Sequence, residues 1–320
     1  MTEAGRALEP PRRGIRAPAV QDRKGDDQSA ARRSASPMDQ PSVLTVRSRA
    51  AAPAGALHRA LTDPDAVRSW LTDQADIDLA QGRYGFWGRH APDGDRPRQR
   101  LLEHRPDRLL RFAWDLKSGP VTVTVRLEPR DHDDTEITVT HEPRPPAGTP
   151  GGNVPYYFWD LAVDNLVNLV EGRRLAPRFE PGPVTDGRAR AQVTIDAAPG
   201  DVYASLIEAG PLSEWTGGTA SVEPWVGGRY DFGWDHGPGD ILLLDPGRAL
   251  AYTWTYPDTP ETVVRWELAD LDGATQVMVV HGRFDDADLA TDFQGGWQAY
   301  LRAIKRLHER GHAWNEAEVR

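Results

Sequence analysis

The chain has 320 residues, which is more than one compact domain ordinarily needs, so two domains are expected. It contains no cysteine, which excludes disulfide scaffolds, thiolate metal sites and cysteine nucleophiles. Its formal charge of −10 argues against a nucleic-acid partner, because neutralising phosphates requires a basic surface. No apolar run approaches the roughly 20 residues that cross a bilayer, so we expect a cytoplasmic protein with no membrane partner.

The N-terminal segment predicts a disordered tail over residues 1–41. It is rich in Arg, Pro, Ala, Asp and Ser and almost free of large apolar residues, so it cannot bury enough surface to offset the entropy of ordering. Met38 lies just before the first strand-like run, 43–46, so both Met1 and Met38 are candidate starts of translation.

The first ordered elements follow directly. A strand is predicted over 43–49, and a helix begins after Pro53, since proline fits the first turn of a helix. Valines alternate with polar residues from Val121 to Leu127, which is typical of a half-buried antiparallel strand. The predicted strands lie at about 75–80, 82–89, 98–104, 108–116, 120–129 and 134–142. A closing helix is predicted from apolar residues at steps of three and four, namely Tyr156, Trp159, Val163, Leu166 and Val170.

The same landmarks return about 140 residues later in the same order, which indicates a duplicated domain rather than a short solenoid repeat. The matched pairs are Trp70 and Trp215, Tyr84 and Tyr230, Phe86 and Phe232, Trp114 and Trp254, His141 and His281, and Trp159 and Trp297. We therefore predict a first copy over 42–176, a linker rich in proline and glycine over 177–189, and a second copy over 190–313.

The second copy begins with a predicted strand over 190–196 and a helix after Pro199. Lys305, Arg306 and Arg310 suit the negative end of the dipole of its closing helix, which we expect to end at Gly311. The apolar stripe of that helix is Phe293, Trp297, Tyr300, Ile304 and Leu307.

This element order predicts an α+β fold in which a curved antiparallel sheet wraps around a long C-terminal helix, twice. A straight helix does not fill a strongly curled sheet, so we expect a gap lined by large side chains, as in a small-molecule site. Core packing alone would equally explain these residues, because a duplicated core repeats as readily as a duplicated site. The candidate ligand-binding residues are Tyr84, Phe86, Phe112, Trp114, His141 and Trp159, with Tyr230, Phe232, Tyr252, Trp254, His281 and Trp297.

Motifs that carry chemistry are scarce in this sequence. It has no phosphate-binding glycine loop, no His-Glu-x-x-His and no Gly-x-Ser-x-Gly, so we predict no cofactor, metal ligand or defined catalytic residue. The acidic runs 131–134 and 285–288 fit turns better than calcium loops, because the ligand spacing is wrong.

Several short sequence motifs resemble those of a known family. They are Ala60-Leu61-Thr62-Asp63-Pro64, Gly227-Gly228-Arg229-Tyr230, the run 245–254 and Thr138-Val139-Thr140-His141-Glu142. With them the sequence resembles the activator-of-Hsp90-ATPase-like branch of the START/Bet v 1 (SRPBCC) superfamily. The resemblance implies a helix-grip fold with a deep cavity under the C-terminal helix. It departs at Gln81 and Gly282, where glycine and glutamate are usual, which puts a chemistry shared by the two copies in doubt. No Hsp90 partner is expected, because residues 1–41 cannot form the N-terminal domain of the co-chaperones.

Three functions are consistent with these observations. The first is binding of a hydrophobic or aromatic small molecule between sheet and helix. The second is a polyketide aromatase/cyclase-type enzyme, in which Arg83, Arg229, His141 and His281 would supply polar groups. The third is a stress or chaperone-linked interaction module, which predicts exposed apolar patches.

Overall fold

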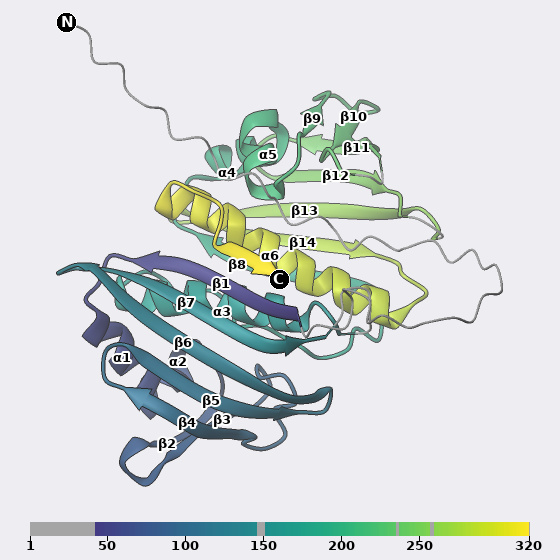
Figure 1. Cartoon of the computed structure of the whole chain (residues 1–320). Coiled ribbons are helices and arrows are strands. Elements are labelled where there is room, and N and C mark those ends of the chain that lie inside the picture. The colour runs from purple at the N-terminus through teal and green to yellow at the C-terminus, as the bar shows by residue number, and fades with distance from the viewer. Residues whose placement is uncertain (1–41, 146–150, 235–236, 257–258, 320) are drawn as a thin grey trace, which may run out of the picture.

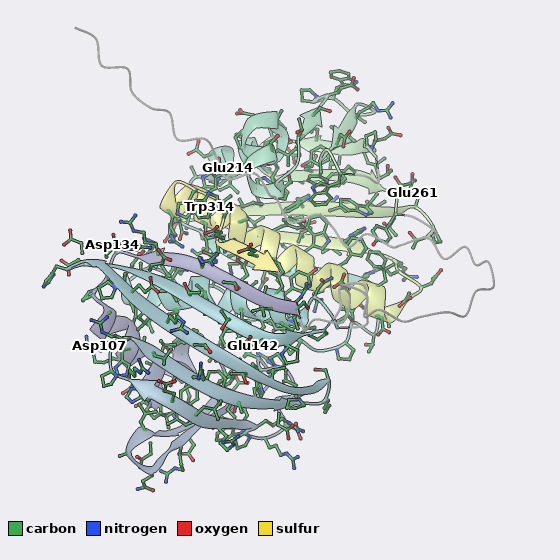
Figure 2. All side chains as sticks on the ribbon, in the orientation of Figure 1. Asp107, Asp134, Glu142, Glu214, Glu261 and Trp314 are labelled. Carbon is green, nitrogen blue, oxygen red and sulfur yellow. The ribbon has the colours of Figure 1, made fainter. Side chains whose placement is uncertain are left out.

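A computed structural model describes residues 42–145, 151–234, 237–256 and 259–319. The tail expected over 1–41 lies outside the described residues. No helix of the described part of the chain is both long enough and apolar enough to cross a membrane. Charged side chains such as Asp107, Glu142 and Glu261 project from the outer surfaces of both copies, in keeping with the acidic composition (Figure 2).

The first copy holds one large sheet, two short helices and one long helix (Figure 1). Its elements are β1 (Ser42–Ala50), α1 (Ala54–Thr62), α2 (Pro64–Trp70), β2 (Gln74–Asp78), a 3₁₀ turn (Leu79–Gln81), β3 (Arg83–Trp87), β4 (Gln99–Arg105), β5 (Leu109–Leu116), β6 (Gly119–Asp131), β7 (Asp134–Arg144) and α3 (Val154–Val170).

The second copy repeats this order and is followed by one more strand. Its elements are β8 (Arg188–Ile195), α4 (Pro199–Ile207), α5 (Ala209–Thr216), β9 (Ser221–Val222), β10 (Arg229–Asp231), β11 (Gly239–Asp245), β12 (Ala249–Trp254), β13 (Thr262–Leu271), β14 (Ala274–Gly282), α6 (Ala287–Arg310) and the added strand β15 (Glu316–Val319).

The two sheets have the same antiparallel topology, β1-β7-β6-β5-β4 in the first copy and β8-β14-β13-β12-β11 in the second. A register shift interrupts the outer pair at the same place in each, at Leu101–Glu103 and at Ile241–Leu243. Such bulges strengthen the local twist of a sheet. At the edge formed by β4 or β11 the copies differ, because β10 and β9 extend the second sheet whereas β2 and β3 pair separately. The predicted α+β fold with two helix-grip domains is confirmed.

The long helices α3 and α6 contact each other between the two sheets (Figure 1). Every residue from Tyr157 to Asn168 of α3 is buried, although this stretch carries charged and amide side chains as well as apolar ones. The apolar side chains pack on the sheet of the first copy. The polar ones therefore need partners on α6, because burying an unpaired charge costs several kcal/mol.

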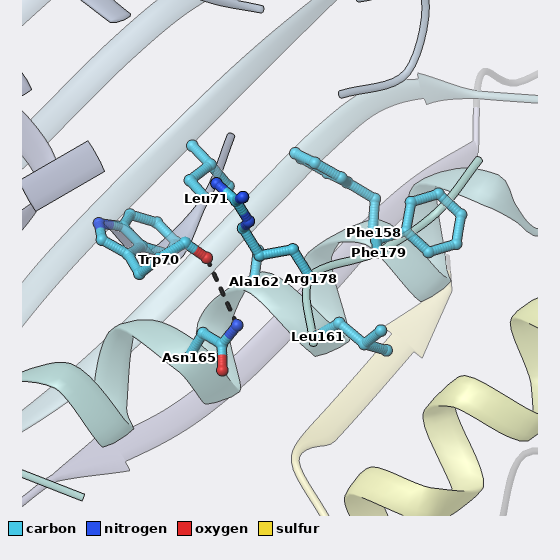
Figure 3. Close-up of a pocket in the computed structure, with 8 residues that line it drawn as sticks. All are labelled: Trp70, Leu71, Phe158, Leu161, Ala162, Asn165, Arg178 and Phe179. Atoms are coloured by element: carbon cyan, nitrogen blue, oxygen red, sulfur yellow. Dashed lines mark hydrogen bonds between the residues drawn. The ribbon is translucent and has the colours of Figure 1, made fainter. Parts of the chain in front are cut away.

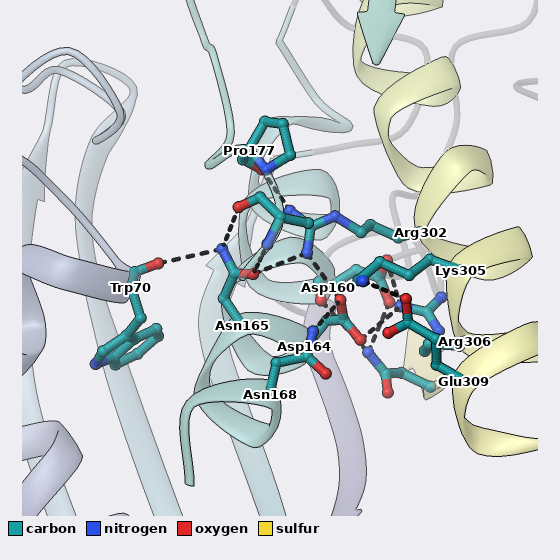
Figure 4. Close-up of polar contacts among 12 residues, drawn as sticks. Trp70, Asp160, Asp164, Asn165, Asn168, Pro177, Arg302, Lys305, Arg306 and Glu309 are labelled. Atoms are coloured by element: carbon teal, nitrogen blue, oxygen red, sulfur yellow. Dashed lines mark hydrogen bonds and ion pairs between the residues drawn. The ribbon is translucent and has the colours of Figure 1, made fainter. Parts of the chain in front are cut away.

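A buried ionic network supplies those partners (Figure 4). Nη1 of Arg302 donates to Oδ2 of Asp164 at 2.7 Å and to Oδ1 of Asn165 at 3.0 Å. Nη1 of Arg306 lies 3.4 Å from Oδ2 of Asp160, and its Nε donates to the carbonyl of Ala313 at 2.9 Å. Burial alone would raise the pKa of Asp164, but the attraction of Arg302 and Arg306 outweighs it and lowers that pKa below its ordinary value.

The end of the chain ties the second copy to the first. Strand β15 pairs antiparallel with β1 and so extends the sheet of the first copy. Asn315, just before β15, donates to Oδ1 of Asp160 at 3.0 Å and accepts from Oγ of Ser48 at 2.9 Å. The sequence analysis assigned Lys305 and Arg306 to the helix dipole, but the structure buries both of them in contacts between the copies or with the second sheet. The two copies thus form one packed unit.

Close approach of α6 to α3 depends on one glycine. A Cβ placed on Gly295 would lie 2.4 Å from Cδ2 of Tyr157, well inside van der Waals contact, whereas a Cβ on Gly296 would meet its nearest atom at 3.7 Å. We expect Gly295→Ala to lower the free energy of unfolding by about 1–3 kcal/mol through overpacking. The neighbouring Gly296→Ala should be neutral or stabilising, because alanine is the better helix former. Chemical denaturation of both variants tests this, and equal stabilities would contradict the packing argument.

Candidate ligand site in the first copy

All twelve aromatic and histidine residues proposed from the sequence lie in the two interiors. Each is at most 4 % exposed, and each copy gathers its own six between its sheet and its long helix. They are Tyr84, Phe86, Phe112, Trp114, His141 and Trp159 in the first copy, and Tyr230, Phe232, Tyr252, Trp254, His281 and Trp297 in the second. Strand parity, with the helical spacing for Trp159 and Trp297, therefore predicted correctly which side chains face inward.

In the first copy, Trp114 on β5 is the centre of the aromatic cluster. Its ring centroid lies 5.1 Å from that of Phe86, 5.4 Å from that of Phe158 and 6.3 Å from that of Trp159. Trp159 on α3 donates its indole N–H to Nδ1 of His141 on β7 at 3.2 Å. This buried hydrogen bond thus links α3 to the sheet within the aromatic cluster.

The second copy repeats that hydrogen bond and adds another. Trp297 on α6 donates to Nδ1 of His281 at 3.1 Å. Nε2 of His281 lies 2.8 Å from Oγ1 of Thr262, which in turn donates to the carbonyl of Trp254 at 3.3 Å. The ring of His281 also packs against Phe284, with centroids 4.6 Å apart. Both nitrogens of His281 therefore have partners.

The part of the chain that the structure describes leaves no open gap of the expected size under either helix, because the rings expected to line it fill it instead. In the first copy the remaining hollow is about 10 Å³, at the limit for one water molecule. In the second copy, essentially no free volume remains beside Tyr230, Phe232 and Trp254. Ligand pockets ordinarily hold about 300–1,000 Å³. A guest of that size would have to displace side chains.

The small hollow of the first copy lies beneath the linker between the copies (Figure 3). Phe179 of the linker packs against Phe158, with ring centroids 6.3 Å apart, and its carbonyl lies 2.9 Å from Nδ1 of His90. Arg178 holds the linker down by donating to the carbonyl of Thr72 at 2.7 Å and to Asp73 at 3.0 Å. The residues lining the hollow are Trp70, Leu71, Phe158, Leu161, Ala162, Asn165, Arg178 and Phe179.

The two interiors differ in how their polar groups are paired. Among the described residues of the first copy, Nε2 of His141 and Nε1 of Trp114 are buried with no hydrogen-bond partner. For His141 the reason lies opposite Trp114 on the neighbouring strand, where β6 carries Val121. At the same register position of the second copy, opposite Trp254, β13 carries Thr262. One side chain thus decides whether the buried histidine has a second partner.

His141 is neutral at ordinary pH in this environment. Burial lowers its pKa from 6.5 to about 4, and the positive charge of Arg144 acts in the same direction. Since Nδ1 accepts from Trp159, the single proton of the neutral ring lies on Nε2. The unpaired atom is therefore a hydrogen-bond donor.

The groups considered for catalysis do not all come together. Arg83 is exposed and is held on the surface by Asp78 and Gln81, and Arg229 is exposed as well. Only the two histidines of that set lie inside, in separate interiors. Among the described residues, no group of three or more histidine or carboxylate side chains is placed to hold a metal ion.

The interaction alternative predicted exposed apolar side chains, and the second copy has some at one sheet edge. Trp225 and Val226, in the loop between β9 and β10, and Leu242 on β11 are 55 %, 65 % and 47 % exposed. The loop reaches β11 through the N–H of Gly227, which donates to the carbonyl of Ile241 at 2.8 Å.

Comparison with known proteins identifies the family. The family model described as "Activator of Hsp90 ATPase homolog 1-like protein" matches residues 51–171 and 196–309, which is once in each copy. The chain belongs to this family. None of the curated proteins matches the chain.

Solved structures resemble this member of the Activator of Hsp90 ATPase homolog 1-like family over one copy or both. The Aha1 dimer from Colwellia psychrerythraea has a TM-score of 0.35 at 20 % identity, covering 39 % of this chain and 97 % of its own. Protein CV1439 from Chromobacterium violaceum has a TM-score of 0.34 at 26 % identity, covering 38 % and 97 %. DynU16, a putative protein in the dynemicin biosynthetic locus, has a TM-score of 0.31 at 19 % identity, covering 83 % of this chain and 99 % of its own. Similarity at this level supports no conclusion about function.

Three residues of the candidate site escaped the sequence analysis of this family member. Phe158 and Phe179 lie on a helix and a linker whose apolar residues carry no strand parity that would point them inward. Val121 was recognised only as a core position of an alternating strand. Aligning the two copies by their strands would have placed Val121 opposite Thr262, which is the signal that separates the interiors.

Proposed function

We propose that this protein binds a hydrophobic or aromatic small molecule inside its first copy, between α3 and the sheet, and that the second copy is structural. The observation that carries the proposal is the pair of unpaired buried donors, on His141 and Trp114, within an aromatic interior. An unsatisfied buried polar group costs about 1–3 kcal/mol, and native proteins seldom keep two in one interior without a use. The second copy has the same rings, but Thr262 pairs its histidine.

Entry from the linker side is the route that the packing favours. Phe179 covers Phe158, and Phe158 contacts both Trp114 and Trp159. A flat aromatic ligand that displaces Phe158 and Phe179 would occupy ring positions already shaped for edge-to-face contacts. The α3–α6 network reaches the hollow at Asn165, which lines it and accepts from Arg302 at 3.0 Å, so α3 stays held to α6 while Phe158 and Phe179 move.

The full-length protein tests this directly. With a panel of apolar and aromatic compounds, we expect at least one to change tryptophan emission and to raise the melting temperature, because a ligand that binds the folded state stabilises it. Trp114→Phe should weaken that binding about tenfold, whereas the matched Trp254→Phe in the second copy should not, because no ligand is placed there. A panel without effect on emission or melting would refute the proposal, and equal loss in both variants would refute the choice of copy.

A further inference from the structure

The chemistry of the two unpaired atoms narrows the class of ligand. Nε1 of an indole can only donate a hydrogen bond. Nε2 of His141 is also a donor, because Nδ1 of the same ring accepts from Trp159 at 3.2 Å. The interior of the first copy therefore presents two uncharged donors, on His141 and Trp114, that no acceptor among the described residues pairs with.

The second copy shows what such a donor requires. There the hydroxyl oxygen of Thr262 lies 2.8 Å from Nε2 of His281 and passes its own proton to the carbonyl of Trp254. A single neutral oxygen, held by the sheet, is enough to satisfy the histidine. In the first copy Val121 takes the register position of Thr262 and supplies only methyl groups. Among the described residues nothing pairs with Nε2 of His141, so a ligand is left to supply its partner.

We infer that the ligand of the first copy is a neutral aromatic molecule bearing a carbonyl-type oxygen, which accepts hydrogen bonds from Nε2 of His141 and Nε1 of Trp114. The inference rests on the proposed function and adds to it the chemical group of the ligand that the protein recognises. An aromatic skeleton fits because the displaced ring of Phe158 has its centroid 5.4 Å from that of Trp114 and 4.8 Å from that of Trp159.

A neutral oxygen is favoured over a carboxylate by the charges around the site. Both donors are uncharged, and burying an anion without a paired cation costs more than two neutral hydrogen bonds return. Arg144 is the charged group that acts on His141, but it is only half-buried and its Nη2 donates toward Oδ1 of Asn153 at 3.4 Å. That hydrogen bond directs Nη2 toward the loop before α3, while the buried Nε of Arg144 has no partner among the described residues.

A matched set of probes separates the alternatives on the full-length protein. The probes are fluorene, 9-fluorenone and fluorene-9-carboxylate, which share one skeleton and differ at one carbon. Calorimetry or tryptophan quenching with each therefore measures the contribution of the oxygen to the binding affinity. We expect 9-fluorenone to bind at least about tenfold tighter than fluorene, as the gain of one to two buried hydrogen bonds predicts. The carboxylate should bind more weakly than the ketone.

A variant tests whether His141 donates the hydrogen bond to the oxygen of the ligand. Val121→Thr copies the arrangement of the second copy, so its hydroxyl should occupy Nε2 of His141 and reduce the preference for 9-fluorenone to about twofold or less. Thr262→Ser keeps the hydroxyl of the second copy and should leave both affinity and preference unchanged. The wild-type preference is measured independently, so the test stands even if Val121→Thr folds poorly.

Each of the other possible results would contradict one part of the proposal. Equal binding of fluorene and 9-fluorenone, or tighter binding of the carboxylate, would disprove the carbonyl inference while leaving the proposed function intact. If Val121→Thr keeps the preference for 9-fluorenone over fluorene, His141 does not donate to the oxygen of the ligand. If none of the three probes binds and the wider panel also fails, the proposed function falls and the inference falls with it.

Discussion

Replacement of Arg302 by methionine should lower the free energy of unfolding by about 3–5 kcal/mol, because it leaves the carboxylate of Asp164 buried without its main partner. The two side chains are only 2 % and 1 % exposed and their charged atoms lie 2.7 Å apart. Arg306, whose Nη1 is 3.8 Å from the other oxygen of Asp164, compensates in part only. Equilibrium denaturation of the full-length protein measures the loss.

Two controls isolate burial as the cause. In the double variant Arg302→Met with Asp164→Leu no unpaired charge remains, so it should be more stable than the single variant. The pair Arg190 and Asp186 has the same 2.7 Å separation but lies on the surface, so Arg190→Met should leave the melting temperature nearly unchanged. A double variant as unstable as the single one would show that lost packing, and not the stranded charge, accounts for the effect.

The second large effect expected is a loss of stability in acid that depends on His141. Its pKa is about 4 in the folded protein and near 6.5 in the unfolded chain, so below pH 6.5 the unfolded state binds more protons. The contribution of His141 is therefore complete above pH 6.5 and is lost as the pH falls toward 4. A shift of this size corresponds to about 3 kcal/mol.

The comparison of wild type with His141→Phe measures that contribution. Other groups titrate over the same range, so the informative quantity is the difference between the two proteins at each pH. We expect wild type to lose stability relative to the variant steadily between pH 6.5 and 4, because His141 gains a proton in the unfolded chain that the buried ring does not take up. Parallel stability curves from pH 7 to 4 would mean that His141 is accessible to water in the folded state.

The sequence by itself was sufficient for the fold and for the inward-facing residues. The period-two pattern of β6 and the three-and-four spacing of α3 and α6 report directly on which side of each element is apolar. The repeat at about 140 residues then indicated two copies, because it matches the length of a whole domain. These conclusions follow from local periodicity, which does not depend on what the element packs against.

Only the tertiary structure decided how full the interiors are and what lies on the polar side of α3. Asp160, Asp164 and Asn168 form a stripe that an isolated helix would turn to water, yet α6 covers it with Arg302 and Arg306. Free volume is likewise a small difference between the space enclosed and the side chains that fill it, and periodicity carries no information on that difference. Pairing of His141 depends on a cross-strand neighbour far away in the chain, so register had to be known before its unsatisfied donor could be seen.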